Sequence, residues 1–316
     1  MALNLGQLRV FEAVTRAGSF AGAARRLGVT PPAVSLQIRQ LEEAHGVRLF
    51  DRVRRRVRLT AAGQTLEPYA QRIVALAADA ERALGETRRF ATGRLRVVAS
   101  GTSAAYYLPP LLTEFRRRYP GLRIHLDVEN SQRVRERVLS LEDDVGVLGV
   151  ETPHPDLVFE LLAEDPLVVI VPPGHPWARR RRLSLAELIG QDLILREPGS
   201  ASRQLVERRL LRLGAGRLPA MEIASNEVIK RAVEMGNGVS LMSAAIVRRE
   251  VEAGHLRALP VRGERLARNI YLVYHRERRE SPLIQALLKV ARELGRGRRR
   301  RNRKELPLPR RGRGSG

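Results

Sequence analysis

The segment that most constrains this chain is residues 27–42, "LGVTPPAVSLQIRQLE", which is typical of a turn followed by a helix. Gly28 permits the backbone that ends a preceding helix, and the Thr30 hydroxyl can cap the helix that follows. Three apolar residues recur at i, i+4 and i+7, namely Val34, Ile38 and Leu41. The spacing predicts a helix with one buried face.

The outer side of this predicted helix carries polar groups. Ser35 and Arg39 are one turn apart and offer a hydroxyl and a guanidinium beside the apolar stripe. Pro31 and Pro32 fall in the first turn, where a missing N–H removes no intrahelical bond. A packed back and a polar, cationic front are what a recognition helix needs in the DNA major groove.

The flanking residues complete a winged helix-turn-helix domain over 1–60. A first helix runs from Leu5 to Ala17, and Ser19 caps a second helix that ends near Leu27. Residues 51–60, "DRVRRRVRLT", predict a short basic hairpin, or wing. Residues 1–60 hold eleven Arg against four Asp or Glu. Helix, turn, helix and wing in this order predict binding to double-stranded DNA.

Composition narrows the class of protein further. The net charge of +23, from 57 Lys and Arg against 34 Asp and Glu, favours nucleic acid over a membrane surface as partner. An arginine-rich chain with a solvated basic face is the alternative. The absence of cysteine excludes disulfides and thiolate metal sites. Without a signal peptide or an 18-residue apolar run, we expect a cytoplasmic protein with no membrane span.

Residues 61–91 predict a long linker helix. Apolar residues alternate by four and three along it, as in a heptad seam: Leu66, Ala70, Ile73, Ala77, Ala80 and Leu84. Pro68 conflicts with a straight helix and should bend it. Such a seam can pair two subunits or pack on its own domain.

From residue 92 to 294 the pattern becomes that of an α/β domain with mostly parallel sheets. Short apolar runs alternate with helical segments, and about 200 residues suit two subdomains with a cleft between them. The runs taken as strands are 95–99, 122–128, 144–149, 157–162, 166–172, 193–195 and 221–224.

Polar residues follow several of these strands and open the next helix. Ligands of open α/β sheets bind beyond the carboxyl ends of strands, at helix N-termini. The candidate ligand-binding residues, which the resemblance given below assigns to an effector site, are Ser100, Thr102, Asn130, Ser200, Ser202, Arg203 and Asn226. Hydroxyls, free N–H groups and one guanidinium would suit a small anionic metabolite; the alternative is that the hydroxyls are only helix caps.

Residues 5–66 resemble the N-terminal domain of LysR-type transcriptional regulators over "LRVFEAVTRAGSFAGAARRLGVTPPAVSLQIRQLEEAHGVRLFDRVRRRVRLTAAG". The resemblance assigns these residues to DNA contact: Thr30, Pro31, Pro32, Ser35, Leu36, Arg39 and the wing residues Arg52, Arg54 and Arg55. Members often have Gln at the place of Pro31 and a polar residue at that of Leu36, so contact with a thymine methyl can replace a hydrogen bond here. The resemblance also implies a homodimer or homotetramer that reads an interrupted palindrome and can contact RNA polymerase.

The C-terminal half resembles the type 2 periplasmic-binding-protein fold with which such regulators bind an effector. The segments that carry this resemblance are "DPLVVIVPPGHPWA", "LILREPGSASR" and "IASNEVIKRAVEMGNGVSLMS". "REPGSASR" and "SNEVIKRAV" are similar to regulators of carbon-fixation operons and of sulfur and cysteine metabolism. Ala105 departs from the carbon-fixation group, whose members often carry Lys there.

Residues 295–316 form a low-complexity tail with ten Lys or Arg and one Glu. Such a tail is expected to be disordered and to add salt-sensitive attraction to DNA phosphate, or to act only as a solubility appendage.

Patterns of enzyme and metal chemistry are missing from the sequence. The histidines lack metal-ligand spacing and are expected to be structural or solvated: His45, His125, His154, His175, His255 and His275. The acidic run 142–144 is interpreted as a solvated connection rather than a catalytic pair. We expect no cofactor, no metal and no enzyme activity. The rival interpretations are a sequence-independent DNA-binding protein and a solute-binding protein on the same fold.

Overall fold

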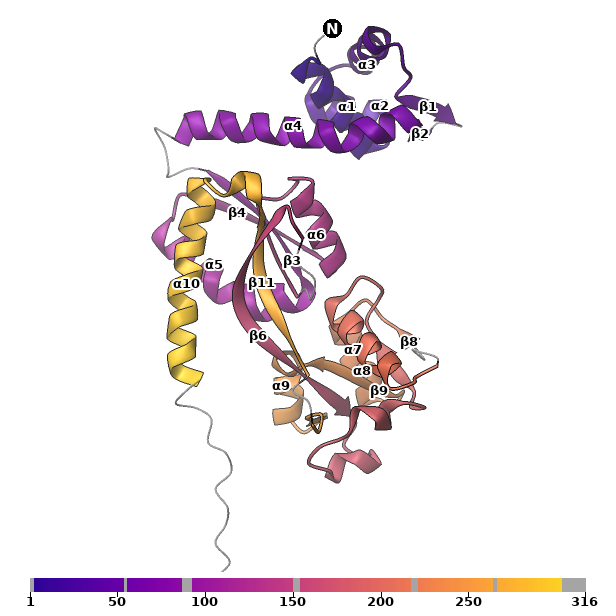
Figure 1. Cartoon of the computed structure of the whole chain (residues 1–316), viewed down its shortest axis with the longest axis vertical. Helices are drawn as coiled ribbons and strands as arrows, with labels where there is room; N and C mark the ends of the chain where they lie inside the picture. The colour runs from indigo at the N-terminus through magenta and orange to yellow at the C-terminus, as the bar shows by residue number, and fades with distance from the viewer. Residues whose placement is uncertain are drawn as a thin grey trace, which may run out of the picture. The chain divides into compact units, whose positions relative to one another are not determined.

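The computed structural model describes residues 3–53, 56–86, 93–149, 154–216, 221–263 and 266–302. The chain divides into two compact units, unit 1 formed chiefly by residues 1–93 and unit 2 chiefly by residues 94–316. Figure 1 shows the helices and strands of both units. Unit 1 is helical with a short hairpin and unit 2 is α/β, as the sequence predicted.

Unit 1 begins with three helices and a hairpin. Each helix ends at a left-handed glycine: Gly18, Gly28 and Gly46, with φ of 61°, 69° and 65°. Ser19 Oγ accepts a hydrogen bond from Gly22 N (3.1 Å) at the start of the second helix. These ends confirm the predicted helices. The elements are α1 (Leu5–Ala17), α2 (Phe20–Leu27), α3 (Pro31–His45), β1 (Phe50–Val53) and β2 (Arg56–Leu59).

Apolar packing joins the hairpin to the helices. The ring centroid of Phe50 in β1 lies 5.1 Å from that of Phe11 in α1 and 5.8 Å from that of Phe20 in α2. The buried core includes Leu8, Phe11, Val14, Ala23, Ala24, Val34, Ile38, Leu41, Leu49 and Phe50. This core holds α3 and the start of the wing as one body.

Helix α4 (Ala61–Glu86) is the predicted linker helix, and it continues through Pro68. The heptad interpretation is only partly right. Ala70 is fully buried in the core of unit 1, and Leu66 packs against that core, so the first seam residues are used within the chain. Tyr69, Ile73 and Leu76 are the large apolar side chains that α4 leaves exposed, among its residues whose side chains are described.

Gly63 fixes the start of α4 against the base of the wing, at Leu49 just before β1 and Leu59 in β2. A Cβ atom on Gly63 would lie 2.2 Å from the backbone oxygen of Leu49 and 2.9 Å from Leu59 Cδ2. We therefore expect Gly63→Ala to lower the free energy of unfolding of unit 1 by about 1–3 kcal/mol. Chemical denaturation checks this against Gly174→Ala, whose Cβ would meet no atom within 4 Å. Equal stability of the two variants would contradict the packing described.

Unit 2 has two lobes joined by two long strands, β6 (Leu157–Val171) and β11 (Ala267–His275) (Figure 1). The first lobe contains β3 (Arg94–Ser100), η1 (Ser103–Tyr107), α5 (Leu108–Arg118), β4 (Arg123–Glu129), α6 (Ser131–Leu139), β5 (Val145–Gly149), η4 (Arg276–Arg278) and α10 (Pro282–Asn302). The second contains η2 (Pro176–Arg179), η3 (Leu185–Leu188), β7 (Leu193–Leu195), α7 (Ala201–Arg212), β8 (Met221–Glu222), α8 (Asn226–Glu234), β9 (Val239–Ser243), α9 (Ala244–Glu252) and β10 (Arg257–Leu259).

The sheet is mixed rather than mostly parallel. Its order is β4-β3-β5-β11-β6-β9-β7-β8, with β10 also paired to β6. The pairs β3–β4, β3–β5, β7–β8 and β7–β9 are parallel, whereas β6 and β11 run antiparallel to their partners. The reason is that the chain crosses between the lobes in both directions, so the two joining strands oppose each other.

The prediction of two strands at 157–162 and 166–172 is wrong, because β6 is continuous over Leu157–Val171. Pro166 has no N–H to donate, and it lies at the end of the register with β11, beside the start of the pairing with β9 at Leu167. A proline is tolerated there. Asp165, the residue before Pro166, fell between the two predicted strands and was therefore not recognised as a buried strand residue.

Helices cover both faces of the sheet in each lobe. In the first lobe, α5 and α10 pack on one face and α6 on the other. In the second lobe, α7 packs on one face and α8 with α9 on the other. This layering leaves the carboxyl ends of the parallel strands at the junction between the lobes.

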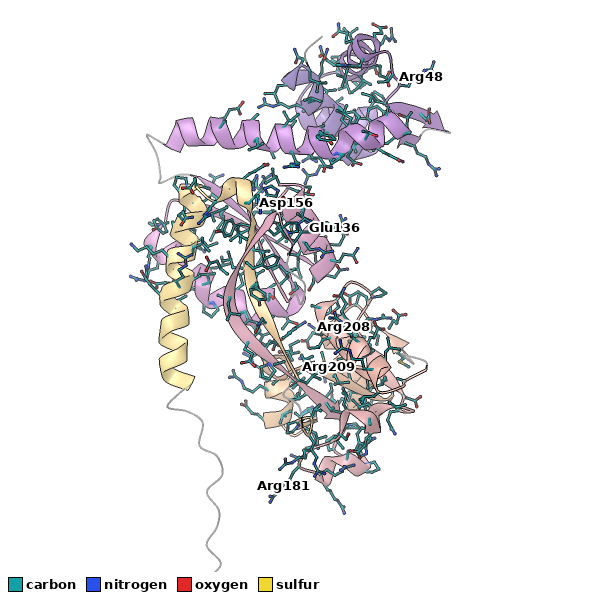
Figure 2. The ribbon with its side chains drawn as sticks, viewed as in Figure 1. Arg48, Glu136, Asp156, Arg181, Arg208 and Arg209 are labelled. Atoms are coloured by element: carbon teal, nitrogen blue, oxygen red, sulfur yellow. The ribbon has the colours of Figure 1, made fainter. Side chains whose placement is uncertain are left out.

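Positive charge is spread over both units. Residues 179–182 of unit 2 are four consecutive arginines, and the exposed Arg181 is labelled in Figure 2. Arg180 pairs with Glu187 at 2.5 Å. The excess of arginine is therefore not confined to residues 1–60, and a DNA-binding role for unit 1 depends on its shape and side-chain placement rather than on charge alone.

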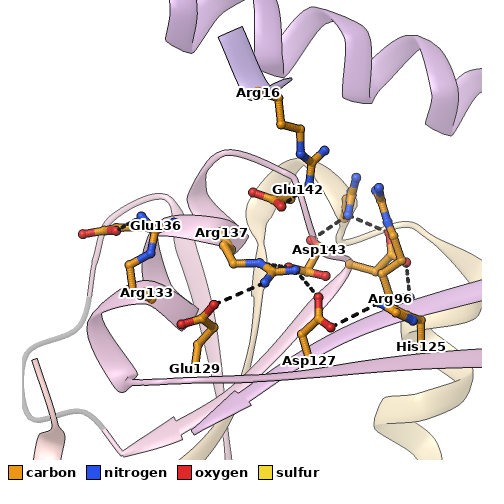
Figure 3. Close-up of polar contacts among 12 residues, drawn as sticks. Arg16, Arg96, His125, Asp127, Glu129, Arg133, Glu136, Arg137, Glu142 and Asp143 are labelled. Carbon is orange, nitrogen blue, oxygen red and sulfur yellow. Dashed lines mark hydrogen bonds and ion pairs between the residues drawn. The ribbon is translucent and has the colours of Figure 1, made fainter. Parts of the chain in front are cut away.

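The acidic run 142–144 is not the solvated connection that we predicted. Asp143 and Asp144 are buried. Arg137 Nε donates to Asp143 Oδ2 and Arg137 Nη2 to Asp127 Oδ2, both at 2.6 Å, as Figure 3 shows. Arg278 Nη1 donates to Asp144 Oδ1 at 2.7 Å. Arginines distant in sequence neutralise these carboxylates, and the hydrogen bond from Arg137 lowers the pKa of Asp127.

The predicted tail begins later than expected. Helix α10 continues to Asn302, past the predicted start at Gly295, because its arginines are good helix formers. Residues 303–316 lie outside the described residues, so the remaining part of the tail stays a prediction.

Within the described ranges, no helix is both long and apolar enough to cross a membrane. The same residues contain no group of three or more His, Cys, Asp or Glu arranged to hold a metal ion. Three of the predicted structural histidines accept a hydrogen bond at Nδ1 from a backbone N–H two residues later: His154, His175 and His275.

Candidate nucleic-acid interface and inter-lobe site

Helix α3 has the buried back that the sequence predicted. Thr30 Oγ1 accepts from Ala33 N at 3.4 Å, and prolines occupy the first two positions of the helix. The stripe of Val34, Ile38 and Leu41 is buried against α1, α2 and the hairpin. The structure therefore confirms the start and the buried face of α3 that capping and periodicity predicted.

The front of α3 carries the residues predicted to contact DNA. Pro31, Pro32 and Arg39 are exposed, Leu36 is 50% exposed and Ser35 is half-buried. Arg39 makes no ion pair with any residue in the described part of the chain, so its guanidinium is available to a ligand. A narrow face with a guanidinium, a hydroxyl and small apolar groups can enter the major groove.

The wing is an antiparallel hairpin in which Arg52 of β1 faces Val57 of β2 in the register. Arg54 and Arg55 lie outside the described residues. DNA contact by Arg52, Arg54 and Arg55 therefore stays a prediction.

In unit 2, the predicted effector residues lie at the junction between the lobes. Ser100, the last residue of β3, and Thr102 are buried, and Ser100 Oγ shares a hydrogen bond with Ser103 Oγ at 2.8 Å. Ser200 and Ser202, at the start of α7, are also buried and share a hydrogen bond at 3.0 Å. Hydroxyls from both lobes are thus buried at helix starts.

Short contacts bring these segments together across the junction. Gln132 N donates to Gly199 O at 3.1 Å. A Cβ atom on Gly199 would lie 3.1 Å from Asn130 Oδ1, and one on Gly101 would lie 3.8 Å from Asn226 Nδ2. The loops after β3 and β4 therefore meet the starts of α7 and α8, and we call this region the inter-lobe site.

Two of the predicted residues have other roles that the structure shows directly. Asn130 Oδ1 accepts from Arg133 N at 3.0 Å and so caps α6, the role that the alternative interpretation gave to the hydroxyls. Asn226 Oδ1 accepts from Arg196 Nη1 at 2.7 Å. Both amides keep their nitrogen for a further contact, because each uses only its oxygen here.

Arg203 is bound by three acceptors, all of them in the second lobe. Its Nε donates to Glu207 Oε1 at 2.7 Å and its Nη1 to Arg196 O at 2.9 Å. Arg203 also pairs with Glu222 of β8. Sequence reasoning missed this, because Glu222 follows 19 residues later and no local pattern links the two.

The structure adds a buried polar cluster that the sequence analysis missed. Asp165 of β6 and Arg268 of β11 are directly opposite in the register, and Asp165 is 0% exposed. Asp165 Oδ2 accepts from Arg268 Nε (2.9 Å) and lies 2.8 Å from Nη2. Asp165 Oδ1 accepts from Tyr107 OH (2.8 Å) and from Ser243 Oγ. Burial, followed by the charge of Asp165, raises the pKa of Tyr107.

Comparisons with known protein families match both units. Residues 5–64 match the model of the bacterial regulatory helix-turn-helix protein, lysR family. Residues 88–296, more than half of the chain, match the model of the LysR substrate binding domain.

The chain belongs to the LysR family of transcriptional regulators.

Relatives in the LysR family match nearly the whole chain. The HTH-type transcriptional regulator CbbR of Xanthobacter flavus is 39% identical over 287 residues, 90% of this chain and 86% of that protein. The RuBisCO operon transcriptional regulator of Allochromatium vinosum is 37% identical over 282 residues, 89% of this chain and 93% of that protein. Membership of this family confirms the expectation of a regulator rather than an enzyme.

Solved LysR-family structures agree with the fold. A full-length OxyR variant from Pseudomonas aeruginosa superposes with a TM-score of 0.73 at 23% identity, covering 92% of this chain and 95% of that one. The regulatory domain of CcmR from Synechocystis PCC6803, in complex with 2-PG, superposes with a TM-score of 0.60 at 29% identity, covering 65% of this chain and 98% of that one.

Proposed function

We propose that this LysR-family protein binds an interrupted palindrome in double-stranded DNA as a dimer or tetramer and regulates a carbon-fixation operon. The main support for DNA binding is that one face of α3 is apolar and buried, while Arg39 is exposed on the opposite face. The carbon-fixation target is supported by a relative named as a RuBisCO operon regulator, which is 37% identical over nearly its full length. Such a protein would act in the cytoplasm and contact RNA polymerase at the promoter.

The proposed pairing surface is the exposed apolar side of α4. Tyr69, Ile73 and Leu76 leave large apolar groups in water, which a second copy can cover. A mostly apolar hollow of about 370 Å³ adjoins this side and is lined by Leu3, Leu41, His45, Val47, Leu49, Ala62, Thr65, Leu66 and Tyr69. A two-fold axis through this surface would place two α3 helices on two half-sites.

We expect Leu76→Asp to shift the protein towards lower oligomers, because a carboxylate would have to be buried at the pairing surface. Sedimentation velocity measures the shift. Gln64→Asp is the matched control, since Gln64 is exposed on α4 and lies nine positions before Ile73, which places it on the opposite side of the helix. Equal sedimentation of both variants and the unchanged protein would place the pairing surface elsewhere.

The proposed effector is a small anionic metabolite bound at the inter-lobe site. The support is the gathering of buried hydroxyls at the starts of helical segments from both lobes, at Ser100, Ser200 and Ser202. The CcmR regulatory domain, similar in fold and 29% identical, is in complex with 2-PG. Binding there would shift the balance between two arrangements of the lobes and so alter the DNA-bound state. No cofactor is required by this proposal.

Binding to a carbon-fixation promoter fragment tests the proposed target. The affinity should exceed that for an unrelated fragment of equal length by at least about 10³-fold at physiological salt. A sequence-independent binder, the second candidate that the +23 charge favours, would bind both fragments equally, with the same steep salt dependence. Equal affinities would contradict the proposed function.

A further inference from the structure

Arg268 is a buried guanidinium with donors left over. A guanidinium has five N–H donors, and the contacts of Arg268 to Asp165 engage only Nε and Nη2. The side chain is 4% exposed. Nη1 of Arg268 is not among the fully buried side-chain atoms that lack a partner in the described residues, so it is open to solvent, where an anionic ligand can replace water.

The surroundings of Arg268 are those of the inter-lobe site. A point one Cβ bond from Gly149, at the end of β5, lies 3.0 Å from Arg268 Cδ, 3.4 Å from its Nε and 3.3 Å from Ala201 Cβ. Ala201 is the first residue of α7, a helix of 12 residues. The guanidinium is therefore next to the helix start that carries Ser200 and Ser202. The positive end of α7 and the cation favour the same anion.

Asp165 holds Arg268 in this position. One carboxylate oxygen contacts the guanidinium, and the other accepts from Tyr107 in the first lobe and Ser243 in the second. These four side chains come from η1, β6, β9 and β11. A guanidinium that is fixed before binding loses little side-chain entropy when it takes a ligand.

The other two arginines near the site are each held by more than one residue. Arg196 donates to both carboxylate oxygens of Glu197 and to Asn226 Oδ1. Arg203 is bound by Glu207, Glu222 and the backbone oxygen of Arg196. Arg203 leaves Nη2 and Arg268 leaves Nη1 without a partner in the described part of the chain, but Arg268 differs from the other two because its guanidinium contacts a single side chain, Asp165.

We propose that Arg268, positioned by Asp165, binds one carboxylate or phosphate group of the effector at the inter-lobe site. This inference rests on the proposed function of that site and adds the cation that the ligand requires. Carboxylates and phosphates both present anionic oxygens that a guanidinium can bind. The test therefore uses probes of both classes.

The test is isothermal titration calorimetry on the full chain with four probes: 2-PG, inorganic phosphate, citrate and glycerol. Arg268→Lys keeps the charge that Asp165 needs but replaces the planar fork with a single nitrogen. Loss of one charged hydrogen-bonding group predicts about a 10- to 100-fold weaker affinity for the anion that binds best. Arg181→Lys, an equivalent change at an exposed residue, should leave that affinity unchanged.

A second variant separates binding from folding. Asp165→Asn with Arg268→Met removes both charges of the buried pair together, so no charge is left alone in the interior. This double variant should stay folded by circular dichroism and bind the anion at least as weakly as Arg268→Lys.

The outcomes distinguish this inference from the proposed function. Anion binding to the unchanged protein that persists at equal affinity in both Arg268 variants would overturn the role of Arg268 and leave the anionic effector in place. Binding of glycerol in preference to all three anions would overturn the anionic effector and this inference together. Failure of all four probes to bind the unchanged protein would likewise contradict both.

Discussion

Arg39→Glu lowers the affinity of the protein for its operator by about 100-fold or more, because a base or phosphate contact worth about 1–3 kcal/mol is replaced by repulsion from DNA. Arg39 is exposed on the front of α3, and the core below it is formed by Val34, Ile38 and Leu41. The variant therefore keeps the fold of unit 1. Fluorescence anisotropy with labelled operator, at one fixed salt concentration, measures the loss.

A matched charge change shows whether this loss is local. Arg181→Glu makes the same change of charge at an exposed residue of unit 2 (Figure 2). It should weaken operator binding only through the net charge, an effect that falls as salt is raised. If both variants lost the same affinity at every salt concentration, α3 would have no special role.

Asp165→Ala lowers the free energy of unfolding of unit 2 by about 3–5 kcal/mol, since it leaves the guanidinium of Arg268 buried without its counter-charge. The variant also removes the acceptor of Tyr107 and Ser243. Chemical denaturation followed by circular dichroism should show a lower midpoint for the transition of unit 2 and an unchanged one for unit 1.

The double variant Asp165→Ala with Arg268→Met should recover part of this stability, because the isolated charge is gone. Additive losses in the double variant would show that the two residues do not stabilise each other. That result would contradict the arrangement in which Asp165 positions Arg268.

Local features of unit 1 were predictable because they depend on neighbours in the sequence. Thr30, the two prolines and the period of Val34, Ile38 and Leu41 determine the start and the buried face of α3 within one short segment. The same reasoning placed the hydroxyls of the inter-lobe site at helix starts, since helix starts follow strand ends in α/β folds.

The features that sequence reasoning missed depend on residues far apart in the chain. Asp165 and Arg268 are separated by 103 residues, and only the antiparallel register of β6 and β11 brings them together. Pro166 was taken as a strand break, although its position at a change of pairing partner makes it harmless. The ion pair between Arg203 and Glu222 on β8 was not foreseen either.

Charge patterns and single periodicities were the least reliable predictors of which residues are exposed and which are buried. Asp143 and Asp144 have the composition of a solvated turn, yet arginines from α6 and η4 bury and neutralise them. The seam of α4 was also inferred from one periodicity, whereas Ala70 packs inside unit 1 and Tyr69 is 61% exposed. When a helix has apolar residues on two sides, only its tertiary contacts show which of them pack within the chain and which are left to pair with a second copy.

The most direct test of sequence-specific regulation is selection of genomic DNA fragments by the purified full-length protein, at moderate salt and with competitor DNA. We expect strong enrichment of a few interrupted palindromes, including one upstream of carbon-fixation genes, and loss of that enrichment with Arg39→Glu. Uniform recovery of fragments, unchanged by Arg39→Glu, would contradict the central claim and favour binding through charge alone.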